Sequence, residues 1–149
     1  VGVWRGGTPV GIAVQELLHY NGFPSDHISI RTSSYEGIEN QRDDVRVHGL
    51  HYIIENVNAE DSLLIVDDVF DSGRSIQAII DRIASVSRRN MPKTIRVATV
   101  YYKPAKRLVE CTPDYYIHEV DDWLVFPHEL NGLTHEEVAR AKPSALSKN

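Results

Sequence analysis

The stretch LLIVDDVFDSGRSI, residues 63–76, indicates most clearly how this chain folds. Residues 63–66 form a continuous apolar run of strand length, which is typical of a central parallel strand covered on both faces. Residues 67–75 are polar and predict a loop. Isoleucines at helical spacing follow and predict a helix from residue 76 to about residue 88. In open parallel sheets ligands bind beyond the carboxyl ends of the strands, so residues 67–75 are the predicted site.

The composition of this loop suits a ligand that carries both phosphate and sugar. Ser72, Gly73 and Ser75 are small, so backbone N–H groups at a helix start can approach phosphate oxygens closely. Asp67 and Asp68 would repel phosphate, and they favour an adjacent sugar diol or metal ion instead. The alternative is an ordinary strand-to-helix loop with capping acids. The Gly-rich patterns of P-loop and dinucleotide sites are absent.

Outward from this stretch, strands and helices alternate as far as residue 101. The pattern predicts strands at residues 1–4, 28–30, 45–48 and 95–101 and helices at about 9–20 and 50–57, with Thr8 as the first helix's cap, and a long loop over residues 32–44. This alternation predicts an α/β fold, a three-layer, mostly parallel sheet flanked by helices.

Beyond Pro104 the alternation breaks, and we expect a small C-terminal lobe, the hood, at about residues 104–149. It should contain strands at 115–120 and 123–126 and a short helix with a Thr134–Glu137 capping box. Residues 1–149 thus form one predicted domain with its core at about 1–103. Val1 opens the chain inside a strand-like run, so we expect further residues before it.

Bulk composition excludes several classes of partner. The 149 residues carry a formal net charge of −5, without a basic stripe or a long apolar run. This predicts no nucleic-acid partner and no membrane partner. A lone cysteine, Cys111, and the lack of a visible signal peptide favour a cytoplasmic protein.

Residues 66–75 resemble the phosphoribosyl pyrophosphate (PRPP) motif of type I phosphoribosyltransferases. The resemblance continues through the chain in the same order. It includes a pyrophosphate loop at residues 4–7, a flexible catalytic loop at 33–35 and 40–42, a purine-reading strand end at 102–104, and a hood at 113–116 and 123–127. Together these segments resemble the 6-oxopurine branch, as in bacterial xanthine–guanine and hypoxanthine enzymes.

The resemblance implies a role for each sugar-phosphate residue. Asp67 and Asp68 would bind the ribose hydroxyls, and Mg²⁺ mainly through substrate and water. The 5′-phosphate would be held by Asp71, Ser72, Gly73, Arg74 and Ser75, and the pyrophosphate by Arg5 and Gly6. Closure over the reaction would involve Ser33, Ser34, Tyr35 and Arg42.

The implied base site lies around Lys103. Its ammonium would donate to the exocyclic O6, a keto oxygen, which an adenine lacks. Trp123 would stack on the purine, and Leu124 would offer backbone groups to its edge. Asp71 would face purine N7 and accept the leaving proton, so Asp71, Lys103 and Arg42 are the implied catalytic residues.

The implied function is transfer of the 5-phosphoribosyl group of PRPP to a 6-oxopurine in purine salvage, with Mg²⁺, by a homodimer or homotetramer. The alternatives are a non-catalytic PRPP-binding regulatory protein or a transferase for another base, such as adenine or a pyrimidine. The loop between Tyr35 and Asn40 is one residue longer than in the bacterial pattern, and residues 127–129 read Pro-His-Glu where that pattern has Pro-Trp-Asp. Xanthine, guanine and hypoxanthine therefore stay unranked.

Overall fold

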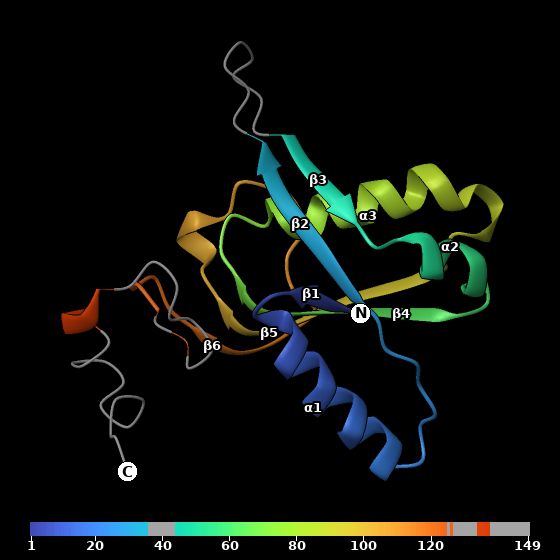
Figure 1. Ribbon diagram of the computed structural model, residues 1–149, viewed down its shortest axis with the longest axis horizontal. Helices are drawn as coiled ribbons and strands as arrows, with labels where there is room; N and C mark the ends of the chain where they lie inside the picture. Colours follow the sequence, from blue (N-terminus) through green and yellow to red (C-terminus); the bar gives the residue numbers. More distant parts are fainter. Residues whose placement is uncertain (36–43, 125, 127–133, 138–149) are drawn as a thin grey trace.

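A single six-stranded sheet organises the chain, seen in a computed structural model that describes residues 1–35, 44–124, 126 and 134–137. The strand order is β3-β2-β1-β4-β5-β6 (Figure 1). All neighbours are parallel except β2 and β3. The strands are β1 (Gly2–Trp4), β2 (Ser29–Tyr35), β3 (Asp44–His48), β4 (Ser62–Phe70), β5 (Thr94–Tyr102) and β6 (Tyr115–Glu119).

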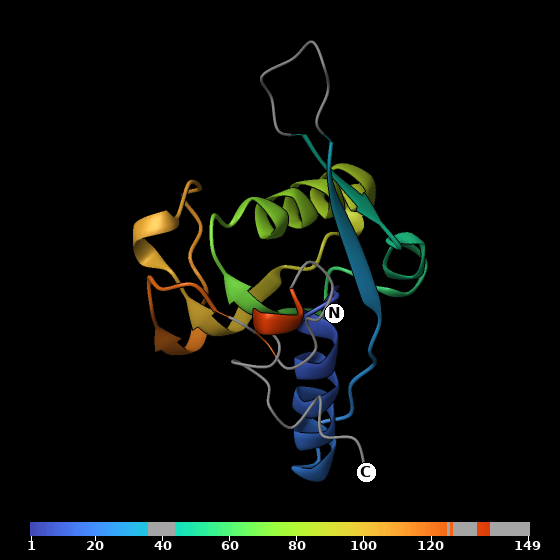
Figure 2. The ribbon, with the colours of Figure 1, turned by 60° about the vertical axis from the view of Figure 1, so that its left-hand side comes forward.

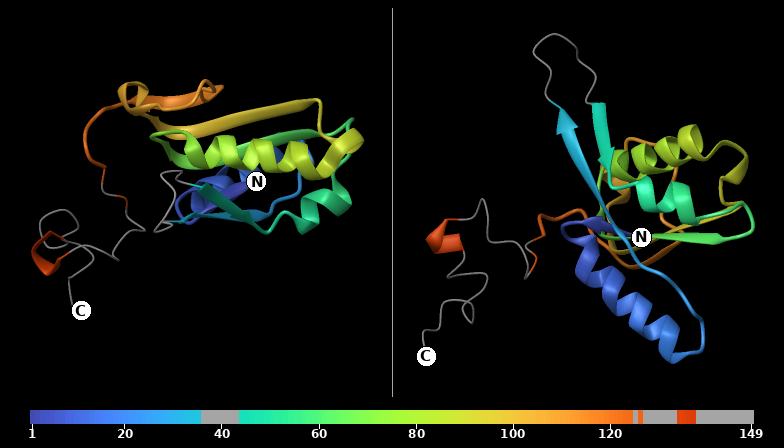
Figure 3. Two further views of the ribbon diagram at one scale, coloured as in Figure 1. Left: turned by 90° about the horizontal axis from the view of Figure 1, so that it is seen from above. Right: turned by 45° about the vertical axis from the view of Figure 1, so that its right-hand side comes forward.

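Helices cover both faces of the sheet. α1 (Gly7–Tyr20) lies on one face, and α3 (Arg74–Ser87) lies on the other with α2 (His51–Asn56) beside it (Figures 1 and 2). Seen from above, α3 runs along β4 and β5 (Figure 3). Two short 3₁₀ helices, η1 (Arg88–Asn90) and η2 (Pro104–Lys106), follow α3 and β5. The predicted three-layer α/β fold is confirmed.

The core lies between the sheet and α3. Ile76, Ile79 and Ile83 are fully buried, and their spacing places them on one face of the helix. Ile65 and Val66 are consecutive in β4 and both buried, which requires cover on both faces of the sheet. The apolar run that predicted a central strand is confirmed.

Two strands extend further than predicted. β4 continues through Phe70, because its pairing with β5 persists to Phe70↔Tyr102, so residues 67–70 are strand rather than loop. β2 continues to Tyr35 through antiparallel pairing with β3, so residues 32–35 are also strand. In both places a backbone ladder with a neighbouring strand overrides the polar local sequence.

Two further differences concern the residue at which α1 begins and the extent of the sheet. α1 begins at Gly7 with Gly6 as its N-cap, so the predicted Thr8 cap is wrong. Thr8 Oγ1 instead shares a hydrogen bond of 3.3 Å with Ser29 Oγ. Residues 115–119, which the sequence assigned to the hood, pair with β5 and extend the sheet.

For the segment after β6, one prediction is confirmed and one is wrong. Residues 123, 124 and 126 are not in a strand, contrary to expectation. The capping box is confirmed, since the Thr134 N–H and Oγ1 both donate to Glu137 Oε2, at 2.7 and 2.9 Å. Within the described ranges, no helix is long and apolar enough to cross a membrane.

Candidate active site

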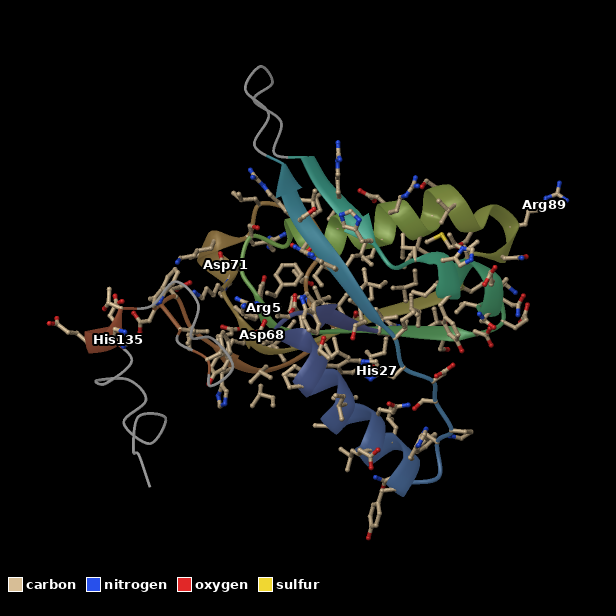
Figure 4. The ribbon with its side chains drawn as sticks, in the orientation of Figure 1. Arg5, His27, Asp68, Asp71, Arg89 and His135 are labelled. Carbon is tan, nitrogen blue, oxygen red and sulfur yellow. The ribbon has the colours of Figure 1, made fainter. Side chains whose placement is uncertain are left out.

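The predicted site residues gather where three parallel strands end. β1, β4 and β5 deliver Arg5, Asp71 and Lys103 just beyond their carboxyl ends. Arg5, Asp68 and Asp71 lie in the same part of the molecule, far from Arg89 after α3 (Figure 4). The Lys103 N–H donates to the Phe70 carbonyl at 2.9 Å, which joins the end of β5 to the end of β4. The topology therefore produces one site from segments far apart in sequence.

A pair of glycines lies directly against the acidic pair of β4. A Cβ added at Gly6 would overlap the Asp68 carboxyl group, and one at Gly7 would lie 2.8 Å from Asp67 Cα. Only glycine permits this approach of backbone to carboxylate. The 5–7 loop and the acidic pair consequently form a single wall of the site.

Burial defines the electrostatics of this wall. Asp67 and Asp68 are 9% and 8% exposed. Burial, together with the neighbouring charge of Asp68, raises the pKa of Asp67 well above its ordinary value. The Asp68 N–H donates to Asp67 Oδ1 at 3.0 Å. Ionising Asp67 is therefore less favourable here than ionising an exposed carboxyl group.

Residues 71–75, called the 71–75 loop here, comprise the turn after β4 and the first two residues of α3. Gly73 has a φ of +79°, a left-handed conformation that favours glycine. The Arg74 N–H donates to Ser72 Oγ at 3.4 Å, and Thr32 Oγ1 donates to Ser75 Oγ at 3.4 Å. A tight glycine turn running into a helix N-terminus is an arrangement that binds anions.

The ammonium of Lys103 lies between a carboxylate and an indole. Lys103 is 3% exposed. Its Nζ is 3.5 Å from Asp71 Oδ2 and 6.0 Å from the centre of the Trp123 ring. Trp123 itself is 81% exposed, so its face is open to a flat ligand. A donor, an acceptor and an aromatic face converge here, which suits a heterocycle with polar edges.

The proposed catalytic loop is only partly described. Ser33, Ser34 and Tyr35 belong to β2, and Ser33 Oγ shares a hydrogen bond of 3.2 Å with His48 Nε2. Arg42 lies outside the described residues. Leu124 is half-buried in the segment after β6.

Sequence reasoning missed Thr32 and Leu108, which form hydrogen bonds with the 71–75 loop. Thr32 bonds to Ser75, and the Leu108 N–H donates to the Ser72 carbonyl at 2.9 Å. The sequence predicts a loop at Thr32, and only the extension of β2 brings this residue to the site. For Leu108 the sequence offers only its place shortly after Lys103.

Comparison with known proteins gives a consistent picture. The family described as phosphoribosyl transferase domain matches residues 1–131. A hypoxanthine-guanine phosphoribosyltransferase of Streptococcus pyogenes is 26% identical over 120 residues, covering 80% of this chain and 61% of the relative. One from Pan troglodytes is 31% identical over 70 residues, covering 47% of this chain and 30% of the relative. The chain thus spans about three fifths of the length of the streptococcal relatives.

Solved structures with a similar fold include phosphoribosyltransferases. A purine phosphoribosyltransferase from Pyrococcus horikoshii Ot3 has a TM-score of 0.66 at 26% identity, covering 89% of this chain and 78% of that one. A Helicobacter pylori xanthine-guanine-hypoxanthine phosphoribosyltransferase shares the fold, with a TM-score of 0.59 at 19% identity over 81% of this chain and 69% of that one. The first is named for purines in general and the second for three 6-oxopurines. On the strength of the match to residues 1–131, this chain belongs to the phosphoribosyl transferase domain family.

Proposed function

We propose that the protein transfers the 5-phosphoribosyl group of PRPP to a 6-oxopurine, that is xanthine, guanine or hypoxanthine, and releases pyrophosphate, as in purine salvage. One observation carries this proposal: a subsite suited to phosphate lies next to a subsite suited to a heterocyclic base. The anion-binding turn at residues 71–75 meets the Lys103 ammonium and the Trp123 face through Asp71. A transferase that joins a sugar phosphate to a heterocycle needs this adjacency.

The sugar-phosphate half of the site would hold PRPP along the ends of β1 and β4. The 71–75 loop would hold the 5′-phosphate through backbone N–H groups and the hydroxyls of Ser72 and Ser75. The ribose hydroxyls would reach Asp67 and Asp68. Arg5 and the Gly6 backbone would contact the pyrophosphate, where a guanidinium offers a fixed fork of donors.

The residues present fit Mg²⁺ bound chiefly by substrate. Asp68 and Asp67 offer carboxylate oxygens, the ligand type that Mg²⁺ prefers while keeping waters and phosphate oxygens. When bound, the ion would neutralise the pyrophosphate as it leaves. Asp67 and Asp68 would orient it from the ribose side.

The base half of the site would select and activate the purine. Lys103 would donate to the O6 keto oxygen and Trp123 would stack on the ring, with Leu124 at its edge. As N9 forms its bond to ribose C1′, the C1′–O bond to pyrophosphate breaks and the N7 proton passes to Asp71. Lys103, 3.5 Å from Asp71, stabilises that carboxylate before the transfer.

Residues 1–149 would act as one domain whose hood closes the base site, and Ser33, Ser34, Tyr35 and Arg42 would close over the reacting centre to exclude water. We propose a homodimer or homotetramer in the cytoplasm, without nucleic-acid or membrane partners.

The test is a product assay with PRPP, Mg²⁺ and, separately, guanine, xanthine, hypoxanthine, adenine and uracil. We expect a nucleotide from at least one 6-oxopurine and none from adenine or uracil. Nucleotide formation with adenine or uracil alone would contradict the base assignment. PRPP binding without any product would indicate a regulatory protein.

Two substitutions separate the roles within the site. Asp71→Asn should lower kcat by about 10²-fold or more while PRPP still binds, because a general base contributes on that scale. Lys103→Ala should reduce kcat/KM for 6-oxopurines selectively. Unchanged turnover in the first variant, or an equal loss for every base in the second, would contradict the assigned roles.

A further inference from the structure

The segment Arg107–Glu110 lies against the 71–75 loop although it follows β5 and η2. The Leu108 N–H donates to the Ser72 carbonyl at 2.9 Å. The Val109 side chain fills the space beside Gly73, since a Cβ added at Gly73 would overlap Val109 Cγ2. Two consecutive residues of the segment therefore contact two consecutive residues of the loop.

The hydrogen bond to Ser72 also orients the next amide. The Ser72 carbonyl and the Gly73 N–H belong to one planar trans peptide, so they point in opposite directions. With the carbonyl held toward Leu108, the Gly73 N–H is directed away from the 107–110 segment. An anion site built from backbone N–H groups depends on such fixed peptide orientation.

Arg107 holds the segment in this shape. Its Nη1 donates to the Val109 carbonyl at 2.6 Å and to the Glu110 carbonyl at 3.0 Å. One guanidinium thus binds the carbonyls of two consecutive residues, Val109 and Glu110, and Val109 is the residue that contacts Gly73. Hydrogen bonds from charged donors are among the stronger ones in proteins.

We infer that Arg107 is a positioning residue for the 5′-phosphate. It acts through the 107–110 segment, which fixes the Ser72–Gly73 peptide, and it does not touch the substrate. This inference rests on the proposed function, because it concerns the phosphate that the 71–75 loop would hold.

The test compares steady-state kinetics of the wild type, Arg107→Gln and a matched control, Arg96→Gln. Arg96 is also an exposed arginine, bonded through Nη1 to Asp114 Oδ1 at 2.6 Å near the opposite end of β5. In R107Q we expect KM for PRPP to rise roughly 3- to 10-fold, the scale of one lost hydrogen bond. The kcat and the KM for the purine should stay within about twofold, since loss of ground-state binding changes KM alone. R96Q should match the wild type.

Product inhibition gives a second readout that general destabilisation would not move. R107Q should weaken inhibition by a purine nucleoside 5′-monophosphate, which carries the 5′-phosphate, and leave inhibition by pyrophosphate unchanged. The salt dependence of KM for PRPP should be the same in R107Q and wild type, because no charge contact to substrate is lost. A flatter salt dependence in R107Q would overturn the inference in favour of a direct phosphate contact.

The outcomes distinguish this inference from the proposed function. A wild-type protein that forms no nucleotide overturns the proposed function. An active wild type beside an R107Q variant with unchanged KM for PRPP overturns the positioning role. If thermal melting shows that R107Q does not fold, Val109→Ala makes the same test, because it removes the contact with Gly73 directly. An unchanged KM for PRPP in V109A would then overturn the role.

Discussion

Gly6 is the residue where the site has least room. Replacing it with alanine would place a Cβ on the Asp68 carboxyl group, so either the 5–7 loop or the carboxylate must move. We expect Gly6→Ala to raise KM for PRPP by about tenfold or more, the change that about 1.4 kcal/mol of lost binding produces, measured by steady-state kinetics.

The matched control is Gly22→Ala. Gly22 has a φ of +81° with nothing within 4 Å of an added Cβ. The alanine is strained there by backbone conformation alone, so G22A should lower Tm and leave KM for PRPP unchanged. A G6A variant with the wild-type KM would refute the close-approach argument.

The ionised carboxylate of Asp67 lowers the stability of the folded protein, although the proposed site requires it. Because burial raises its pKa, the native state binds more protons than the unfolded state between the unfolded pKa of about 4 and the raised native value. Stability therefore falls as pH rises through that window. Asp67→Asn should remove this fall and raise Tm at pH 7, by about 2–4 °C for each kcal/mol relieved.

Thermal melting of D67N and wild type between pH 4 and 8 measures this effect. The gain should shrink toward pH 4, because the carboxyl of the unfolded state also takes up protons there. PRPP affinity should decrease at the same time, since the ribose contact is weakened. A gain in Tm of the same size at every pH would show that removing the charge of Asp67 does not cause the gain.

Among the elements, the connection from α1 to β2 carries a half-buried histidine, His27. The His27 ring lies between Gly2 and Gly11, and a Cβ added at Gly11 would be 2.7 Å from its Cε1 (Figure 4). Burial lowers the pKa of His27. The unfolded state then binds a proton more readily, so stability falls as pH drops below about 6.5.

His27→Gln should flatten that part of the stability curve, measured by urea unfolding between pH 5 and 7.5. His51→Gln, at an exposed position of α2 whose side chain is 85% accessible, is the matched control for losing an imidazole. A slope unchanged in H27Q would assign the acid sensitivity to another group.

Elements with a strong periodic pattern of apolar residues were predictable from the sequence. Strand extensions that depend on pairing with a neighbouring strand were not. The isoleucines of α3 predicted a helix at 76–88, and it spans Arg74–Ser87. The carboxylates after Val66 predicted a loop, yet pairing with β5 carries β4 through Phe70. Local polarity cannot reveal a partner strand whose paired residues, such as Tyr102 for Phe70, lie 32 positions further along the chain.

The candidate site likewise includes residues that were predictable from the sequence and residues that were not. Arg5, Asp71 and Lys103 were predictable because each follows a strand of a parallel sheet, and such strands end together. The contact of Leu108 with Ser72 was not, because a backbone hydrogen bond leaves no mark on side-chain identity. Thr32 was missed because the extent of β2 depends on its pairing with β3.

For the whole molecule, ligand binding should appear as added stability. A ligand at about 100 times its Kd adds roughly 2.7 kcal/mol to the free energy of unfolding. For a chain of this size that corresponds to a rise in Tm of about 5–10 °C. PRPP with Mg²⁺ should produce this rise in differential scanning fluorimetry.

Ribose 5-phosphate is the control, since on the proposed assignment it would bind the 71–75 loop and the acidic pair but carries no pyrophosphate. It should raise Tm less than PRPP does. Equal shifts would show that Arg5 and Gly6 contribute nothing to binding, and no shift with either ligand would remove the sugar-phosphate assignment.

The order of segments along the chain has a consequence for laboratory evolution. Residues proposed for the sugar phosphate end with the 71–75 loop, whereas those proposed to bind O6 and the ring face of the base begin at Lys103. The two groups meet through the Lys103–Asp71 pair and the 107–110 segment. A mutant library confined to residues 113–126 would therefore vary the acceptor while the donor half stays intact. Selection from such a library is a direct route to transferases that build nucleotides from unnatural bases.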